Sequence, residues 1–220
     1  MTLQRRNLVL AASAVTALSV WASGGLSSAH AATSTSTATA QTVDWPITIT
    51  HQLGTTVIKK RPERVAALEM NEADFLDQLG VPIAGMVKDY VPHFLAKYKS
   101  DPKVQDLGAI VQPNMERVHA LRPDLILITS LQANHYQELS EIAPTLHYDV
   151  DFKNSQKGHI EVVKDNLLAL GRVFGKETLA QNKAAELDAK VTEVRRITEG
   201  RSEKALIVLH NNGAFSSFGQ

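Results

Sequence analysis

The sequence has 220 residues, of which 23 are Lys or Arg and 23 are Asp or Glu, so its formal net charge is zero. With 44% hydrophobic and 5% aromatic residues, the composition is typical of a folded soluble chain and excludes collagen, coiled-coil arrays and disorder. The charge balance argues against a nucleic-acid-binding protein, which needs a basic excess to neutralise phosphates. The chain contains no cysteine, which excludes disulfides, thiolate metal sites and a lipid-modified cysteine after an export signal.

Residues 1–31 have the pattern of an export signal. Arg5 and Arg6 form a basic start, residues 8–22 are uncharged and mostly apolar, and Ala-His-Ala at 29–31 offers small residues around a cleavage point. We predict cleavage after residue 31 and a periplasmic location, with the Sec and Tat routes both open. A retained membrane anchor is the alternative, although the apolar stretch is short for a helix that spans a bilayer.

Residues 32–45 lack apolar periodicity and are rich in Thr, Ser and Ala, which predicts a flexible spacer before the fold. Loss of the signal would remove two arginines and no acidic residue, leaving the mature chain at a net charge of −2. The exported part is therefore expected to be mildly acidic.

Apolar periodicity and turn residues predict alternating strands and helices from residue 47 to residue 174. A hairpin is expected over residues 47–59, buried strands over 65–68, 81–87, 125–128 and 145–150, and helices over 71–79, 113–121, 132–142 and 160–174. Asn71 is the predicted N-cap of the first helix, and Gly80 is predicted to end it. The alternation indicates an α/β fold in which helices connect neighbouring strands.

The last part of the sequence predicts one long helix followed by two strands. Residues 176–199 are amphipathic, and at about 1.5 Å per residue they reach roughly 35 Å, enough to bridge two lobes. Residues 205–209 and 214–218 predict strands around a turn at 211–213. Two strands cannot bury their faces alone, so we expect a second lobe that the sequence does not contain, or else a hairpin that docks on the first lobe.

Five blocks in a fixed order carry a resemblance to a known family. They are Arg-Pro-Glu-Arg-Val at 61–65, Leu-Gly at 107–108 with Pro-Asn-Met-Glu-Arg-Val at 113–118, Ala-Leu-Arg-Pro-Asp-Leu-Ile at 120–126, Glu-Ile-Ala-Pro-Thr-Leu at 141–146, and Phe-Ser-Ser-Phe-Gly at 215–219. Together they resemble the periplasmic iron-siderophore-binding proteins of ABC transporters, in particular the catecholate and petrobactin branch. The resemblance extends from about residue 46 to residue 220.

This resemblance implies a two-lobed α/β periplasmic binding protein whose lobes are joined by a single long helix and hold the ligand between them. Residues 46–175 would form the N-terminal lobe, residues 176–200 the interlobe helix, and residues 201–220 the incomplete start of the C-terminal lobe. The implied function is capture of a ferric siderophore and its delivery to an inner-membrane ABC permease and its ATPase. The resemblance implies a monomer without enzymatic activity, cofactor or nucleic-acid partner.

The expected ligand residues depart from the family's pattern. The resemblance implies arginines at the positions that Leu131 and Ile110 occupy in this sequence. The remaining candidates lie at the ends of predicted strands, where ligands of such folds bind, and they are Tyr90, Leu131, Gln132, Asn134 and His210. For each loop residue, ordinary solvation or local capping is the alternative. Lys88 is a candidate replacement for the missing cations, and simple solvation is again the alternative.

Glu116 has a different expected role, outside the ligand site. The resemblance places it on the outer surface of the lobe, where it would meet an arginine pocket of the permease. The alternative is a first-turn glutamate that the helix dipole favours.

No metal site is predicted, although one pair of residues has a suitable spacing. His147 and Asp149 alternate along an extended segment and so share a face, which suits a pair of metal ligands with His159 or His210 as a third. The chain has eight histidines, so this spacing arises easily by chance. Coordination of iron jointly by the protein and a smaller siderophore stays open.

Two groups of alternative functions remain. Haem, cobalamin or a metal ion could be the ligand of the same fold. An exported α/β hydrolase is the alternative of a different class, but the sequence lacks the G-x-S-x-G elbow, and it also lacks G-x-x-x-x-G-K-[ST], H-E-x-x-H and G-x-G-x-x-G.

Overall fold

The computed structural model describes residues 44–150, 158–204, 206–211 and 213–218. The chain divides into two units, Met1–Thr39 and Ala40–Gln220, and only the second contains described residues. The predicted export signal at 1–31 and residues 32–43 of the predicted spacer lie outside the described ranges.

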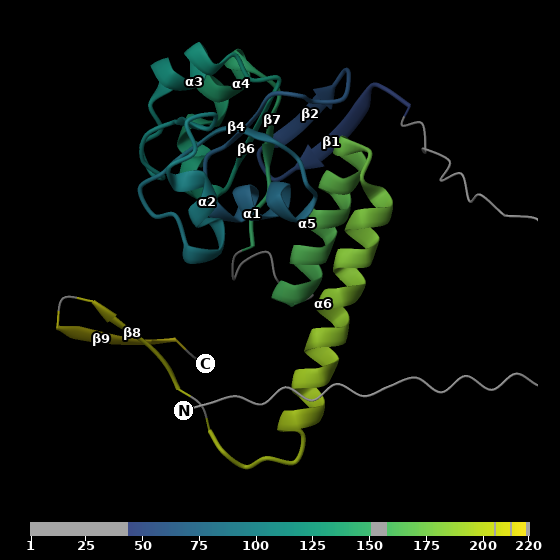
Figure 1. Ribbon diagram of the computed structural model, residues 1–220, viewed down its shortest axis with the longest axis vertical. Helices are drawn as coiled ribbons and strands as arrows, with labels where there is room; N and C mark the ends of the chain where they lie inside the picture. The colour runs from purple at the N-terminus through teal and green to yellow at the C-terminus, as the bar shows by residue number, and fades with distance from the viewer. Residues whose placement is uncertain (1–43, 151–157, 205, 212, 219–220) are drawn as a thin grey trace, which may run out of the picture. The chain divides into compact units, whose positions relative to one another are not determined.

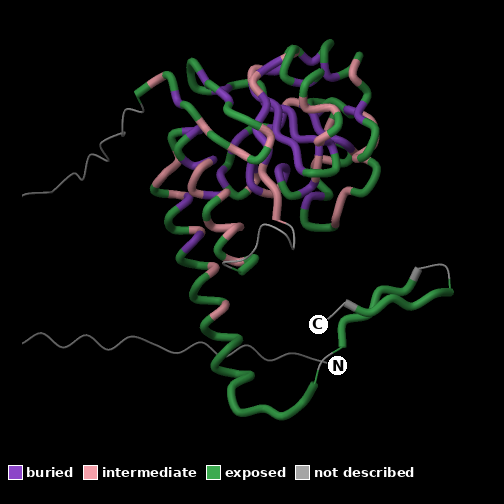
Figure 2. Tube along the Cα trace, turned by 180° about the vertical axis from the view of Figure 1, so that it is seen from behind, coloured by how far each residue is buried: buried purple, intermediate pink, exposed green. Residues whose placement is uncertain are grey.

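A five-stranded parallel sheet forms the centre of the lobe (Figure 1). Its strands, in the order β5-β4-β3-β6-β7, are β5 (Gln105–Asp106), β4 (Ile83–Met86), β3 (Val65–Ala67), β6 (Leu125–Ile128) and β7 (Thr145–His147). Every residue of β3, β6 and β7 is buried, as expected for parallel strands that are covered on both faces. Figure 2 shows these buried segments gathered in the middle of the lobe. The α/β fold expected from the sequence is confirmed.

Helices connect the strands of this sheet. They are α1 (Met70–Gln78), α2 (Ala96–Lys99), α3 (Met115–Leu121) and α4 (Tyr136–Ile142), with 3₁₀ turns η1 (His93–Leu95) and η2 (Ser130–His135), and α5 (His159–Phe174) follows the last strand. In α1 the residues at intervals of three and four, Glu72, Phe75, Leu76 and Leu79 at its C-cap, are buried. This buried stripe, apolar except for Glu72, attaches the helix to the sheet.

An antiparallel hairpin precedes the sheet and is attached to its last strand. It consists of β1 (Ile47–His51) and β2 (Gly54–Ile58), paired from Ile47 opposite Ile58 to His51 opposite Gly54. The hydroxyl of the buried Thr56 donates to the carbonyl of Thr145 in β7 over 2.6 Å. This bond fixes the hairpin to the edge of the sheet.

Several predicted boundaries are wrong by a few residues. Glu69, not Asn71, caps α1, because its carboxylate accepts the Asn71 N–H over 2.8 Å. The strand predicted over 81–87 is β4, which begins at Ile83, and the strand predicted over 145–150 is β7, which ends at His147. The helix predicted over 132–142 is divided between η2 and α4, and η1, α2 and β5 were not predicted.

The long helix predicted over 176–199 is confirmed as α6 (Glu177–Thr198). It packs against α5 through small residues, because a Cβ placed on Gly171 would lie only 2.5 Å from the Cβ of Ala180. The buried residues of α6 are Ala180 and Ala184, both in its first half, and the ribbon continues past the N-terminal end of α5 (Figure 1). Within the described ranges, no helix combines the length and the apolar character needed to cross a membrane.

The final described elements are β8 (Ile207–Asn211) and β9 (Ala214–Phe218), which form an antiparallel hairpin with Ile207 opposite Phe218. The first of these strands begins two residues later than the predicted 205–209. Large apolar side chains of this segment are exposed, namely Leu206, Ile207, Val208, Leu209 and Phe215.

Candidate functional site

The strand order reverses once, next to β3. From β3 the chain adds β4 and β5 on one side and then returns to place β6 and β7 on the other side. In open α/β sheets, ligands bind beyond the carboxyl ends of the strands at such a reversal. Three loops follow strands there, at residues 87–92 after β4, 107–114 after β5 and 129–135 after β6. We call them the carboxyl-edge loops.

Hydrogen bonds to the backbone of Ile110 join the three carboxyl-edge loops. The Ile110 N–H donates to Oδ2 of Asp89 over 3.1 Å, and the Ile110 carbonyl accepts from Nε2 of Gln132 over 2.6 Å. The other end of the same amide, Gln132 Oε1, accepts the Thr129 N–H over 3.0 Å. The loops after β4, β5 and β6 are therefore held in one arrangement by a continuous chain of hydrogen bonds.

Gln132 positions these loops and does not present its side chain to solvent. The residue is 0% exposed, and both ends of its amide are bonded inside the protein. It also completes a capping box with Thr129, which starts η2. We therefore revise its expected role from ligand contact to positioning, because the structure leaves no exposed atom of Gln132 for a ligand to touch.

The other predicted loop residues lie at the surface. Tyr90 is 77% exposed and Leu131 is 52% exposed, and Asn134 is exposed in η2. Ile110 is half-buried, and its neighbour Val111, which the sequence did not single out, is 64% exposed. The hydrogen bonds through Asp89, Ile110 and Gln132 thus bring together the loops that carry these exposed side chains.

Lys88 and His210 have partners within their own segments. The Lys88 ammonium donates to the Asp101 carbonyl over 3.2 Å, which holds the candidate replacement cation toward the segment before β5. His210 lies on β8 and is exposed, and its ring centroid is 4.7 Å from that of Phe215 on β9. The structure thus shows His210 in contact with the partner strand of its own hairpin.

A buried carboxyl group lies beneath the β3–α1 turn. Glu72 is fully buried, and neither of its carboxylate oxygens has a hydrogen-bond partner. Burial, and then the nearby Glu69 carboxylate, raises the pKa of Glu72 well above its ordinary value. The i, i+3, i+4 spacing of Glu72, Phe75 and Leu76 is the sequence signal that marks this residue as inward-facing.

The spacing of His147 and Asp149 does not correspond to a metal site among the described residues. His147 is buried in β7, and its ring centroid lies 6.3 Å from that of His51 in the hairpin. Burial, followed by the neighbouring His147, lowers the pKa of His51. Among the residues that the structure describes, no group of three or more His, Cys, Asp or Glu side chains is arranged to hold a metal ion.

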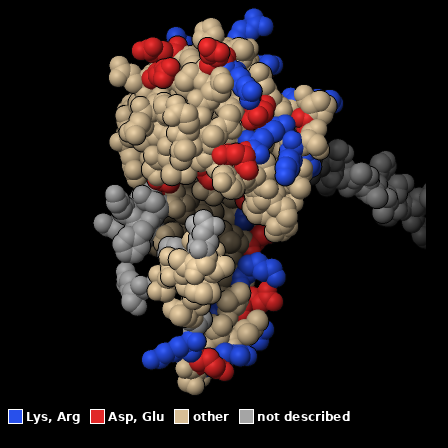
Figure 3. Space-filling view, turned by 90° about the vertical axis from the view of Figure 1, so that its left-hand side faces the viewer, with Lys and Arg blue, Asp and Glu red and all other residues tan. Residues whose placement is uncertain are grey.

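Glu116 lies in the first turn of α3, directly after the carboxyl-edge loop at residues 107–114. Asn114 caps this helix by accepting the Arg117 N–H over 2.9 Å, so Glu116 is held at the helix start and exposed. A groove of about 600 Å³ separates α3 from α4 and is lined by Met115, Glu116, His119, Ala120, Glu138, Glu141 and Ile142. At the top of Figure 3, Asp and Glu side chains lie at this end of the lobe with Lys and Arg side chains beside them.

Comparison with known proteins shows an extended similarity. The sequence pattern of the family described as periplasmic binding protein matches residues 65–220. The ferric-anguibactin-binding protein FatB of Vibrio anguillarum is 64% identical over 179 residues, which cover 81% of this chain and 56% of FatB. The petrobactin-binding protein YclQ of Bacillus subtilis is 33% identical over 190 residues, which cover 84% of this chain and 58% of YclQ.

Solved structures show the same relationship. The siderophore-binding protein BauB, bound to a complex between two molecules of acinetobactin and ferric iron, has a TM-score of 0.76 and 66% identity. That match covers 79% of this chain and 62% of the BauB chain. The chain therefore spans less than two thirds of the length of each of these proteins.

Proposed function

Because the chain belongs to the periplasmic binding protein family, we propose that it is part of a receptor that captures a ferric siderophore in the periplasm and delivers it to an ABC permease. The observation that carries this proposal is the position of the three joined carboxyl-edge loops at the reversal of the strand order. Two relatives support the proposal. FatB, which is 64% identical to the chain, is named for a ferric siderophore, and BauB, which is 66% identical, was solved with one bound.

The proposed role is binding without chemical change of the ligand. Tyr90, Leu131 and Asn134 would contact the ferric complex, while Asp89 and Gln132 hold the loops that carry them. Preformed loops favour binding because less conformational freedom is lost when the ligand arrives. The permease, with its partner ATPase, would then supply the energy of uptake, and the receptor would act as a monomer.

Titration calorimetry of the mature, two-lobed protein tests the ligand. Ferric anguibactin, ferric acinetobactin and ferric petrobactin are titrated in turn, beside haem and cobalamin. We expect saturable binding of at least one ferric siderophore, with one iron bound per protein. Binding of haem or cobalamin together with failure of all three ferric siderophores would overturn the proposal.

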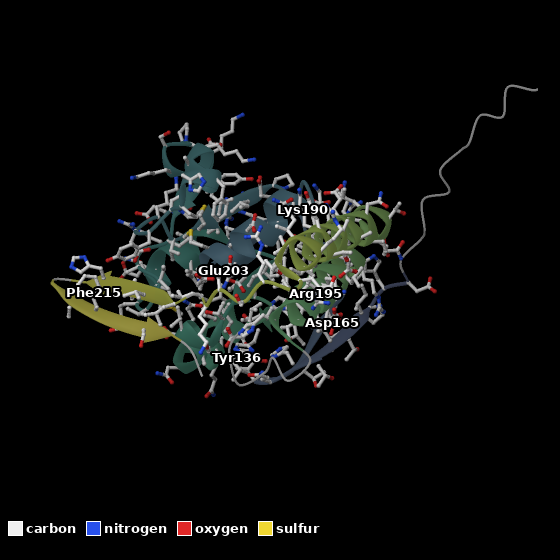
Figure 4. The ribbon with its side chains drawn as sticks, turned by 90° about the horizontal axis from the view of Figure 1, so that it is seen from below. Tyr136, Asp165, Lys190, Arg195, Glu203 and Phe215 are labelled. Atoms are coloured by element: carbon white, nitrogen blue, oxygen red, sulfur yellow. The ribbon has the colours of Figure 1, made fainter. Side chains whose placement is uncertain are left out.

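Glu116 is proposed to dock the receptor on a cationic site of the permease, because it is exposed at the start of α3 beside a groove that Glu138 and Glu141 also line. The variant Glu116→Lys should keep its affinity for the ferric siderophore and lose most iron uptake in cells. The matched control is Asp165→Lys, which reverses another exposed carboxylate, on α5 (Figure 4). Normal uptake by Glu116→Lys, or equal loss in both variants, would contradict docking through Glu116.

A further inference from the structure

The carboxyl-edge loops display apolar side chains and little charge. Tyr90, Val111 and Leu131 each expose more than half of their surface. Tyr90 follows Asp89 and Val111 follows Ile110, the two residues joined by the Ile110 N–H, whereas Leu131 donates its own N–H to the Thr129 hydroxyl at the start of η2. Exposed apolar groups that lie together mark interaction sites, because water solvates them poorly. The edge therefore offers an apolar surface on loops that are already fixed.

None of the hydrogen bonds that fix these loops uses the side chain of residue 90, 111 or 131. The bonds are made by the Ile110 backbone, the Asp89 carboxylate, the Gln132 amide and the Thr129 hydroxyl and backbone. The loops would therefore keep their arrangement if these three exposed side chains changed. The apolar character of these three side chains therefore bears on contact with a ligand and not on the stability of the loops.

Charge on these loops is small and is already engaged. Across residues 87–92, 107–114 and 129–135 the sequence contains Lys88 and Asp89 as its only Lys, Arg, Asp or Glu residues, and it has no arginine there. The Lys88 ammonium donates to the Asp101 carbonyl, and the Asp89 carboxylate accepts the Ile110 N–H. A ligand with several negative charges would lose its hydration here without gaining charge-assisted hydrogen bonds from arginine.

We propose that this edge selects ferric complexes of low net charge whose flat aromatic faces pack on Tyr90, Val111 and Leu131. The inference rests on the proposed function and names the class of ferric complex that the site accepts. Aromatic rings gain both from the burial of apolar area and from their preferred packing against other rings, and Tyr90 provides such a ring. Leu131 is then the residue that determines specificity, because an arginine in its place would introduce the missing cation.

A matched pair of synthetic ligands separates charge from shape. Three catecholate arms on a tripodal backbone give a ferric complex with several negative charges, whereas three hydroxypyridinonate arms on the same backbone give an uncharged complex with similar rings. Each is used to displace whichever relative's ferric siderophore the two-lobed protein binds. We expect the uncharged complex to displace it at a concentration about tenfold lower than the anionic complex.

The variant Leu131→Arg tests the residue itself. It should shift the preference about tenfold toward the anionic complex, the effect of one new charge-assisted hydrogen bond of about 1.5 kcal/mol. Leu131→Gln controls for loss of the apolar side chain, and Val57→Arg, at an exposed apolar position on β2, controls for added charge elsewhere. Neither control should move the preference toward the anion.

The outcomes distinguish this inference from the function on which it rests. If none of the relatives' ferric siderophores binds, the proposed function fails. If a relative's ferric siderophore binds, two results would show that the selection of low-charge complexes is wrong. The first is that the uncharged complex does not displace the siderophore, or displaces it no better than the anionic complex does. The second is that the uncharged complex keeps the same advantage in Leu131→Arg.

Discussion

The packing of α6 on α5 depends on the absence of one side chain. A Cβ at Gly171 would lie 2.5 Å from the Cβ of the fully buried Ala180, a distance at which two methyl groups overlap. Both groups are attached directly to helical backbone, so neither can rotate away. Gly171→Ala should gain about 1 kcal/mol from helix propensity and lose about 3 kcal/mol to overpacking, a net loss of roughly 2 kcal/mol in the free energy of unfolding.

The reverse exchange provides the matched control. Ala180→Gly removes the facing methyl group and should cost roughly 1–2 kcal/mol through lost helix propensity and lost burial. The double variant Gly171→Ala/Ala180→Gly keeps one methyl group between the helices, and its two propensity changes cancel. We expect it to lose no more than about 1 kcal/mol in the free energy of unfolding, so the two substitutions are coupled by about 2–4 kcal/mol.

Urea denaturation followed by circular dichroism measures all four proteins under the same conditions. If the effects of the two single substitutions simply add in the double variant, the two residues do not compete for the same space. The proposed crossing of α5 and α6 through Gly171 and Ala180 would then be refuted.

Two further substitutions test buried or bridging carboxylates. Burial, and then the Glu69 carboxylate, raises the pKa of Glu72, so the folded protein retains a proton that the unfolded chain releases above about pH 4.3. The free energy of unfolding should therefore fall with rising pH by up to about 1.4 kcal/mol per unit, and urea titrations should lack this component in Glu72→Gln. Asp124→Ala removes the acceptor of the Glu63 and Arg64 N–H groups, at 2.9 and 2.8 Å, and should lower the free energy of unfolding by about 1–3 kcal/mol, with Asp124→Asn less affected. Equal pH slopes in the first comparison, or an unchanged urea midpoint for Asp124→Ala, would contradict these assignments.

Local sequence patterns predicted those elements of the fold that residues close together in the sequence determine. The strand at 125–128 is an unbroken apolar run that follows Pro123, and the structure places β6 at Leu125–Ile128. In contrast, β5 consists of two polar residues, Gln105 and Asp106, that become a strand only by pairing with Gly85 and Met86. That pairing joins distant parts of the chain, so no local pattern reveals it.

The candidate site was predictable in place but not in detail. The sequence located Tyr90 and Leu131 directly after strands and Asn134 near the start of a predicted helix, and the structure has Tyr90 in the loop after β4 and Leu131 and Asn134 in η2 after β6. It did not reveal that Gln132 turns inward, because its partner, the Ile110 carbonyl, is 22 residues away along the chain. Side-chain direction in a loop is decided by such distant hydrogen bonds and not by the neighbouring residues.

Attachment over only part of its length makes α6 a lever arm. Its buried residues end at Ala184, and Lys164 of α5 still reaches Asp188 over 2.7 Å, so the stretch from Asp188 to Thr198 is about 15 Å long at about 1.5 Å per residue. A tilt of about 4° where α5 and α6 cross would therefore displace the far end of α6 by about 1 Å. Exchanges among small residues at this crossing can thus redirect whatever follows α6, while every residue of the carboxyl-edge loops stays the same.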